Sequence, residues 1–197
     1  HVNIEESEFN KVIKSDFNIH NNCGNFLDSI KYNVFSRNEC DRDEWINKIK
    51  SMKTEFDFLM KRSDIDSTNL HMEEVLDKLY QETKDKNVIF TTGVGNHQMQ
   101  AYQFIKSQYP NKILSSGSLG VMGSGLPYAV GSQIANKDKM IIAIDGDSSF
   151  NMTMSDLKTI KEHNLPIKIA IMNNNSQMMV TIWEKLYFNE RYTATIN

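Results

Sequence analysis

Two polar clusters, each directly after a short apolar run, carry the side chains most suited to chemistry in this 197-residue sequence. Asp147 follows the run from 140 to 144, and Asn174 follows the run from 167 to 172. Both runs have the length and β-branched content of buried parallel strands, and the segment between them has helical spacing and is long enough for a crossover. Because the carboxyl ends of neighbouring parallel strands meet at one edge of a sheet, we expect Asp147 and Asn174 to lie close together.

A carboxylate and an amide oxygen at such an edge suit a hard cation with a phosphate group. Mg²⁺ takes a small octahedral shell of oxygens, and the protein needs to supply only some of them. Gly146 allows a phosphate close to the backbone, and Ser148 and Ser149 offer hydroxyl and N–H groups where the next helix opens. The pattern therefore predicts a site for Mg²⁺ and a diphosphate. An acidic turn and a polar loop would explain either cluster alone, but explain the pair at this spacing less well.

Glycine-rich stretches follow two further predicted strands. The strand from 88 to 92 leads into Gly93-Val94-Gly95-Asn96-His97, and the strand from 113 to 115 leads into a stretch with glycines at 117, 120, 123 and 125. Glycines at a strand end let the backbone turn tightly and approach a ligand, and polar residues that open a helix favour phosphate. Each stretch could equally be a turn that packs a helix against the sheet, and His97 alone could be a structural loop histidine.

Apolar residues at three- and four-residue steps predict the helices that complete the fold. We expect helices at about 26–32, 43–59, 71–84, 126–135 and 177–186, with the stripe of the second packing against a neighbour. Strands that alternate with helices predict an α/β fold, a parallel sheet with helices on both faces.

Composition narrows the classes of function. A net charge of −3 gives no electrostatic case for nucleic acid or an anionic membrane, and no apolar run approaches the ~20 residues that a membrane helix needs. Cys23 and Cys40 show no CxxC spacing and have no further partner, so reduced thiols are expected.

The motifs together resemble a known family. Gly-Asp-Ser followed by Asn-Asn at this separation is similar to the signature of thiamine-diphosphate-dependent enzymes, which usually begins GDG or GDA. Within them, the chain closely resembles the catalytic subunits of acetolactate synthase, also named acetohydroxyacid synthase. Four stretches carry the resemblance, at residues 91–101, 115–131, 145–153 and 177–192: TTGVGNHQMQA, SSGSLGVMGSGLPYAVG, DGDSSFNMT and QMMVTIWEKLYFNERY.

The resemblance implies a thiamine-diphosphate-binding fold, incomplete at its C-terminus, and a role for single residues. The cofactor-binding residues expected from pattern and resemblance are Val94, Gly95, Asn96, His97, Gly120, Met122, Gly146, Ser148, Ser149, Gln177, Met179 and Val180. The expected Mg²⁺ ligands are Asp147, Asn174 and the backbone carbonyl of Ser176.

Two apolar positions have specific implied roles, and two positions depart from the family. Met122 matches the side chain beneath the cofactor that forces it to bend, and Trp183 matches an aromatic residue that shapes the pocket for a second 2-ketoacid. Asn96 replaces a usual glutamine, which leaves one contact to water. Met178 stands where the family usually has glycine, so it could crowd the cofactor mouth and impair catalysis.

The implied reaction is decarboxylation of pyruvate and ligation of the product to a second 2-ketoacid, in branched-chain amino acid biosynthesis. The glutamate that activates the cofactor belongs to an N-terminal domain of the partner subunit in this family, so we assign no catalytic residue to this chain. The resemblance also implies FAD, a homodimer or tetramer with the active site at the subunit interface, and a possible regulatory subunit. The implied compartment is the cytoplasm in bacteria, and plastids or mitochondria in eukaryotes.

By the same resemblance, residues 1–33 end a middle domain, 34–68 form a helical linker and 69–197 form a truncated thiamine-diphosphate domain, so we expect an internal fragment of a longer chain. Two alternatives stay open. Another enzyme with this cofactor, such as a pyruvate oxidase, a glyoxylate carboligase or a 2-ketoacid decarboxylase, is disfavoured by Trp183. A non-catalytic cofactor-binding module is favoured by Met178 and Asn96 but disfavoured by the retained Asp147 and Asn174.

Overall fold

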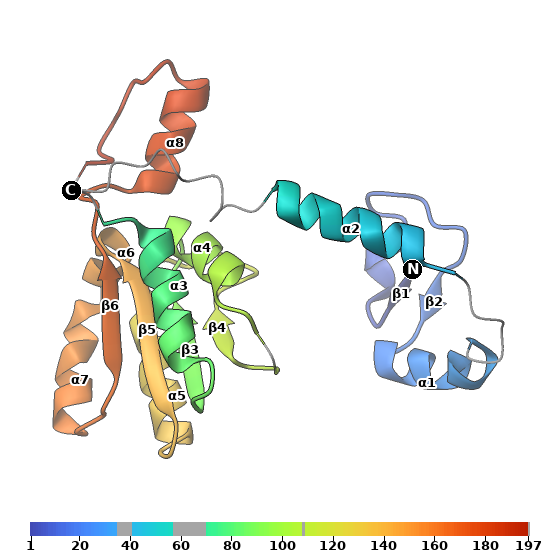
Figure 1. Cartoon of the computed structure of the whole chain (residues 1–197), viewed down its shortest axis with the longest axis horizontal. Coiled ribbons are helices and arrows are strands. Elements are labelled where there is room, and N and C mark those ends of the chain that lie inside the picture. The colour runs from blue at the N-terminus through green and yellow to red at the C-terminus, as the bar shows by residue number, and fades with distance from the viewer. Residues whose placement is uncertain (35–40, 57–69, 108, 197) are drawn as a thin grey trace. The chain divides into compact units, whose positions relative to one another are not determined.

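The computed structural model describes residues 1–34, 41–56, 70–107 and 109–196 (Figure 1). The chain divides into two compact units, His1–Lys61 and Arg62–Asn197, which are described separately. Cys40 and the predicted boundary at 68/69 lie outside the described residues, and Cys23 is a free, exposed thiol. The predicted domain limits therefore stay predictions.

The first unit is small and mostly exposed. Strands β1 (Val2–Asn3) and β2 (Ile19–His20) pair in parallel, with a 3-10 helix, Glu6–Glu8, between them. Helix α1 covers Cys23–Val34, and helix α2 covers Asp43–Glu55. Helix α2 forms where the apolar spacing predicts it, but no residue in it is buried and Trp45 is 64% exposed. The expected packing of its apolar stripe is therefore not observed.

The second unit is built on a four-stranded parallel sheet. Its strands are β3 (Val88–Thr92), β4 (Ile113–Ser115), β5 (Met140–Gly146) and β6 (Lys168–Met172), in the order β4-β3-β5-β6. Every pairing is parallel, so all four carboxyl ends meet at one edge. Strand β5 is buried along its centre because helices cover both faces of the sheet.

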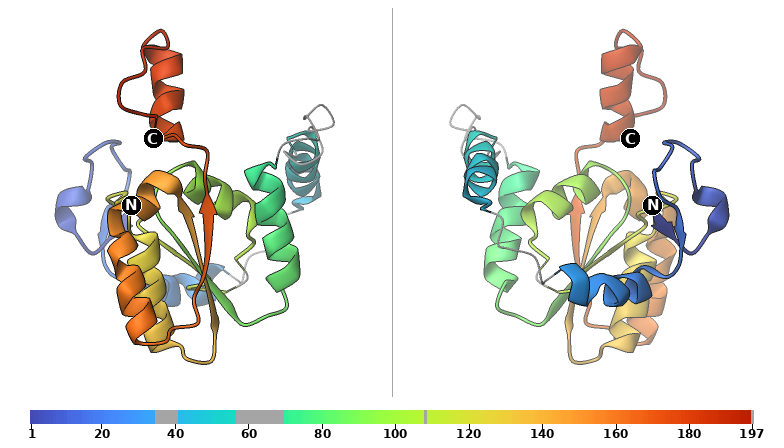
Figure 2. Two further views of the ribbon diagram at one scale, coloured as in Figure 1. Left: turned by 90° about the vertical axis from the view of Figure 1, so that its left-hand side faces the viewer. Right: turned by 90° about the vertical axis from the view of Figure 1, so that its right-hand side faces the viewer.

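The helices confirm the predicted α/β fold with two apolar layers (Figure 2). Helices α3 (Met72–Thr83) and α4 (Asn96–Phe104) cover one face, where Leu76 and Phe104 pack with Phe90 of β3. Helix α5 (Gly125–Ala135) covers the other face, where Ala129 packs with Ile141 of β5. Burial of these side chains is the main free-energy term that holds the strand ends in register.

The crossover between β5 and β6 differs from the single helical segment that the spacing predicts. Helix α6 (Asp147–Thr153) begins directly after β5, a 3-10 turn follows at Met154–Asp156, and α7 (Leu157–Glu162) completes the crossover. Thr, Ser and Asp have low helix propensities, which is consistent with the break there. Strand β5 also extends beyond the predicted end at 144, because residues 145 and 146 pair with residues 171 and 172 of β6.

Helix α8 (Met178–Tyr187) extends past the carboxyl edge of the sheet (Figure 1). The segment after it returns, so that Ser176 forms an antiparallel bridge with Ile196. Glu184 fixes this return, because its two carboxylate oxygens accept bonds from the Thr193 N–H and the Thr195 hydroxyl, each at 2.9 Å. Among the described residues, no helix has the length and apolarity that would let it cross a membrane.

Candidate functional site

A cavity of about 180 Å³ lies at the carboxyl edge of the sheet. It is walled by the ends of β5 and β6, the loops that follow β3 and β4, and the first turn of α8. All of the predicted cofactor-binding and metal-ligating residues line it, and Trp183 does not. The structure thus brings four separate stretches of sequence to one place. The role of each residue there stays a prediction.

Asp147 and Asn174 meet at this cavity as their spacing predicts. Gly146 pairs with Met172 across the two strands, so the side chains that follow leave the sheet at the same level. Asp147 Oδ1 accepts a bond from the Ser148 N–H at 2.9 Å, and Asn174 Oδ1 accepts one from the Ser176 N–H at 3.2 Å. These local bonds limit the side-chain rotamers, and carboxylate and amide oxygens are the kind of ligand that a hard cation takes.

The glycines beside this pair make room for a histidine ring. A Cβ atom on Gly146 would lie 3.0 Å from His97 Nδ1, and one on Gly95 would lie 3.0 Å from His97 Cε1. Gly95 also has φ +152°, a backbone conformation that side chains disfavour. The loop after β3 can therefore approach the end of β5 closely only because both positions are glycine.

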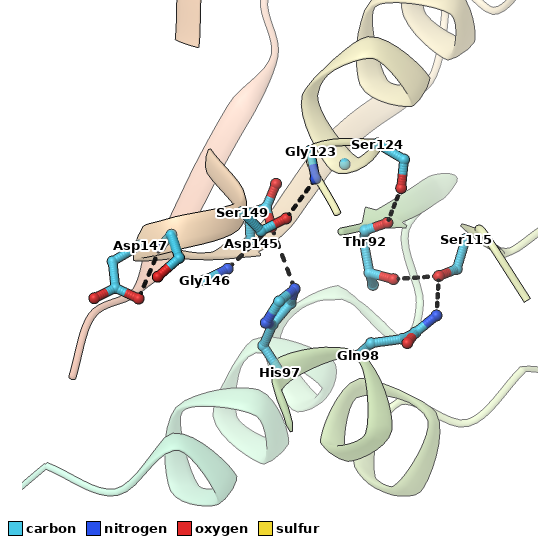
Figure 3. A network of polar contacts seen from close by, with 12 residues as sticks. Thr92, His97, Gln98, Ser115, Gly123, Ser124, Asp145, Gly146, Asp147 and Ser149 are labelled. Atoms are coloured by element: carbon cyan, nitrogen blue, oxygen red, sulfur yellow. Dashed lines mark hydrogen bonds and ion pairs between the residues drawn. The ribbon is translucent and has the colours of Figure 1, made fainter. Parts of the chain in front are cut away.

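A buried acid that the motif analysis did not single out contacts His97, which lines the cavity (Figure 3). Asp145 is 1% exposed, and its Oδ1 lies 3.2 Å from Nε2 of His97, which is also buried. The same oxygen accepts a bond from the Gly146 N–H at 3.0 Å. A buried carboxylate is stable only when it is paired, so an acid at the end of an apolar strand was the signal that could have revealed it.

Two hydrogen-bond networks support the loops around the cavity (Figure 3). The Thr92 hydroxyl and the Gln98 amide both donate to Ser115 Oγ, at 2.7 and 2.6 Å, and so link β3, α4 and β4. On the other side, Ser149 Oγ accepts a bond from the Gly123 N–H at 2.8 Å. Ser149 is 1% exposed, so its predicted phosphate contact would have to use its remaining hydroxyl donor.

The remaining wall of the cavity is largely methionine. The members are Met72, Met122, Met172, Met178 and Met179. Met72 and Met172 were not predicted to line the site, because a methionine on a helix or strand is usually a residue of the hydrophobic core. Flexible thioether side chains beside an oxygen-rich end suit a ligand with an apolar ring at one end and an anionic group at the other.

Comparison with known families decides among the ligands that such a cavity could take. Residues 93–197, more than half of the chain, match the family model described as thiamine pyrophosphate enzyme, C-terminal TPP binding domain. The chain belongs to the thiamine pyrophosphate enzymes. The match begins at the glycine loop after β3 and includes every predicted cofactor-binding and metal-ligating residue.

Relatives within this family share most of the chain. The mitochondrial acetolactate synthase catalytic subunits of Aspergillus candidus and Saccharomyces cerevisiae are 37% and 35% identical to it over 98% and 99% of its length. The chloroplastic acetolactate synthase of Arabidopsis thaliana is 34% identical over 99%. The chain spans only 28–29% of the length of these relatives.

The cavity fits the cofactor of a thiamine pyrophosphate enzyme. Its carboxylate, amide and hydroxyl oxygens can share a divalent cation with a diphosphate, and its methionines can contact the two rings. Trp183 lies outside this lining, is 56% exposed, and contacts Tyr187 with ring centroids 4.8 Å apart. Its predicted contact with a second ketoacid remains a prediction.

Proposed function

We propose that this chain forms the cofactor-binding part of an acetolactate synthase, which uses thiamine diphosphate and Mg²⁺. The observation that carries the proposal is the single cavity that joins Asp147 and Asn174 with the glycine loops after β3 and β4. Identities of 34–37% to acetolactate synthases over nearly the whole chain support the choice of reaction.

In this proposal the polar end of the cavity holds the cation and the diphosphate. Asp147 and Asn174 supply one side-chain oxygen each, and Ser176 supplies its backbone carbonyl, so water and diphosphate oxygens complete the octahedral shell. Only Asp147 is charged, which limits repulsion of the anionic cofactor. The loop Val94–His97, which lines the same cavity, would contact the diphosphate.

In this proposal the apolar side chains of the cavity would orient the rings of the cofactor. Met122 lies in the cavity wall, where the family resemblance places the side chain that forces the cofactor to bend. Met179 and Val180, from the first turn of α8, line the cavity, and the family resemblance implies that they also line the substrate channel. When bound, thiamine diphosphate supplies the nucleophilic carbon for the ketoacid and stabilises the electron pair that decarboxylation releases.

The proposal extends to the whole protein by resemblance. The substrates would be pyruvate and a second 2-ketoacid, with Trp183 selecting the second. The activating glutamate would come from a partner subunit in a homodimer or tetramer, and FAD and a regulatory subunit would complete the assembly. This chain spans only 28% of the length of the first two relatives, so these features are proposed for the whole protein.

A substrate panel on the intact protein tests the reaction. With thiamine diphosphate and Mg²⁺ present, we expect pyruvate alone to give acetolactate, and pyruvate with 2-ketobutyrate to give the mixed product. The separate measurement of carbon dioxide and acetolactate distinguishes the alternatives. Carbon dioxide without any ligated product would contradict the proposal and favour a decarboxylase or an oxidase with the same cofactor.

A further inference from the structure

Side-chain hydroxyls of α6 form hydrogen bonds with both the backbone N–H and the backbone carbonyl of Gly123. Its N–H donates to Ser149 Oγ at 2.8 Å (Figure 3), and its carbonyl oxygen accepts a bond from Thr153 Oγ1, also at 2.8 Å. Ser149 and Thr153 are four residues apart, so their side chains lie on the same face of the helix. Two bonds from one rigid face fix the position and the orientation of this part of the backbone.

Close packing reinforces these bonds. Gly123 has φ +80°, which favours glycine, and a Cβ atom there would lie 3.0 Å from Thr153 Cγ2 and 3.1 Å from Met152 Cβ. The backbone at Gly123 therefore packs directly against α6. Met122 immediately precedes Gly123 and lines the cavity, so the contacts that fix Gly123 also constrain the backbone of Met122.

The rest of the loop offers less support to Met122. Leu119 is 87% exposed and Val121 is 51% exposed, and a Cβ atom on Gly117 would meet nothing within 4 Å. The loop is closed locally by a bond from the Val121 N–H to Ser116 Oγ at 3.1 Å. Ser124 Oγ bonds the Val121 carbonyl at 2.9 Å and lies 3.5 Å from the Thr92 carbonyl, whereas the two bonds to α6 hold Gly123 itself, next to Met122.

Helix α6 also begins with Asp147. One short helix thus carries the predicted metal ligand at its first residue and the two hydroxyls that hold the Met122 backbone further along. We propose that Ser149 and Thr153 are positioning residues, which hold Met122 against the bound cofactor at a fixed distance from the metal. The inference rests on the proposed function in one respect, that thiamine diphosphate occupies this cavity.

The first test needs no cofactor. In the intact cofactor-free protein, hydrogen exchange at the Gly123 amide reports the bond to Ser149 directly. Thr153→Val removes the hydroxyl and keeps the shape, while Thr153→Ser keeps the hydroxyl and is the matched control. We expect Ser149→Ala and Thr153→Val to speed exchange by about fivefold or more, since each removes one of the two bonds that hold Gly123, and Thr153→Ser to stay near the wild-type rate.

The second test separates positioning from a merely structural role. In Thr153→Val we expect the affinity for thiamine diphosphate with Mg²⁺ to stay within about threefold, because the diphosphate contacts are untouched. Exchange of the cofactor C2 proton, followed by NMR, should slow by about tenfold or more because the ring is no longer held in the bent geometry. Thr153→Ser should restore that rate.

The outcomes separate this inference from the proposed function. Unchanged Gly123 exchange and unchanged C2 exchange in Thr153→Val would overturn the inference, and so would an equal loss of affinity in the Val and Ser variants. A wild-type protein that binds no thiamine diphosphate would contradict the inference and the proposed function together. A wild type that binds the cofactor and makes no acetolactate would contradict the reaction alone, and the Val and Ser comparison would still decide the inference.

Discussion

At the scale of single residues, the contact between Asp145 and His97 is the least expected part of the site. The carboxylate lies where the loop after β3 and the start of α5 converge, because Cβ atoms on Gly93 and Gly125 would both come within 2.6 Å of it. His97 lines the cavity. The contact between Asp145 and His97 therefore fixes the loop that is predicted to hold the diphosphate relative to the end of β5.

Asp145→Asn tests this role without a change of shape. We expect the affinity for thiamine diphosphate to fall by about 10- to 100-fold, as is usual when a residue that orients a ligand-binding group is lost. Asp138→Asn, at an exposed turn, is the control and should bind as the wild type does. Isothermal titration of the intact protein measures both, and equal affinities in the two variants would show that Asp145 has no part in binding.

A substitution at Met178 tests whether this departure from the family pattern affects catalysis. It lines the cavity at the first residue of α8, where the family usually has glycine. We expect Met178→Gly to widen the mouth and raise kcat/KM for pyruvate, at a cost of about 1 kcal/mol in helix stability. Met52→Gly, at an exposed position of α2 that does not line the cavity, is a control for the loss of methionine from a helix. Unchanged kinetics would mean that Met178 does not obstruct the cofactor or substrate.

At the scale of elements, most of the fold follows from the sequence because each strand is a short apolar run that ends in glycine or a polar cluster. Strands β3 and β4 have the predicted bounds. The extension of β5 through Asp145 was missed, since polar and glycine residues usually end a strand and only the partner strand β6 compensates here. The break at Met154–Asp156 was missed for a different reason: the helix was predicted from the spacing of apolar residues, which does not take the low helix propensity of Ser155 and Asp156 into account.

The candidate site was predictable in part. The meeting of Asp147 with Asn174 followed from the geometry of parallel strands. The bonds that hold Gly123 did not, because they join residues about thirty positions apart through side-chain hydroxyls that have no periodic signature. Local pattern therefore identifies the ligand groups, and only the tertiary structure identifies what positions them.

Two glycines of α5 give a matched test of close packing at the element scale. A Cβ atom on Gly125 would lie 2.6 Å from both Asp145 Oδ2 and the Gly93 nitrogen, whereas one on Gly131 would meet nothing within 4 Å. We expect Gly125→Ala to lower the free energy of unfolding by about 1–3 kcal/mol, and Gly131→Ala to raise it by about 0.5–1 kcal/mol. Chemical denaturation measures both, and a neutral Gly125→Ala would contradict the close approach of α5 to β3.

At the scale of the whole molecule, the chain contains a cavity but no group assigned to acid or base catalysis. The second unit has its own apolar core and contains all of the described residues that line the cavity. Because no acid or base catalyst is assigned to this chain, we expect a protein of these 197 residues alone to produce no acetolactate from pyruvate, even with thiamine diphosphate and Mg²⁺. Measurable acetolactate from this pure polypeptide would contradict the expectation that a partner subunit supplies the activating glutamate.

The most direct test of the central claim is calorimetric titration of the intact protein with thiamine diphosphate, with and without Mg²⁺. We expect Mg²⁺-dependent binding in the wild type, and a loss of about 100-fold or more in Asp147→Ala and in Asn174→Ala, because each removes one of the two oxygens that the side chains give to the cation. Asp138→Ala should bind normally. Wild-type affinity in both cavity variants, or binding that does not depend on Mg²⁺, would contradict the account.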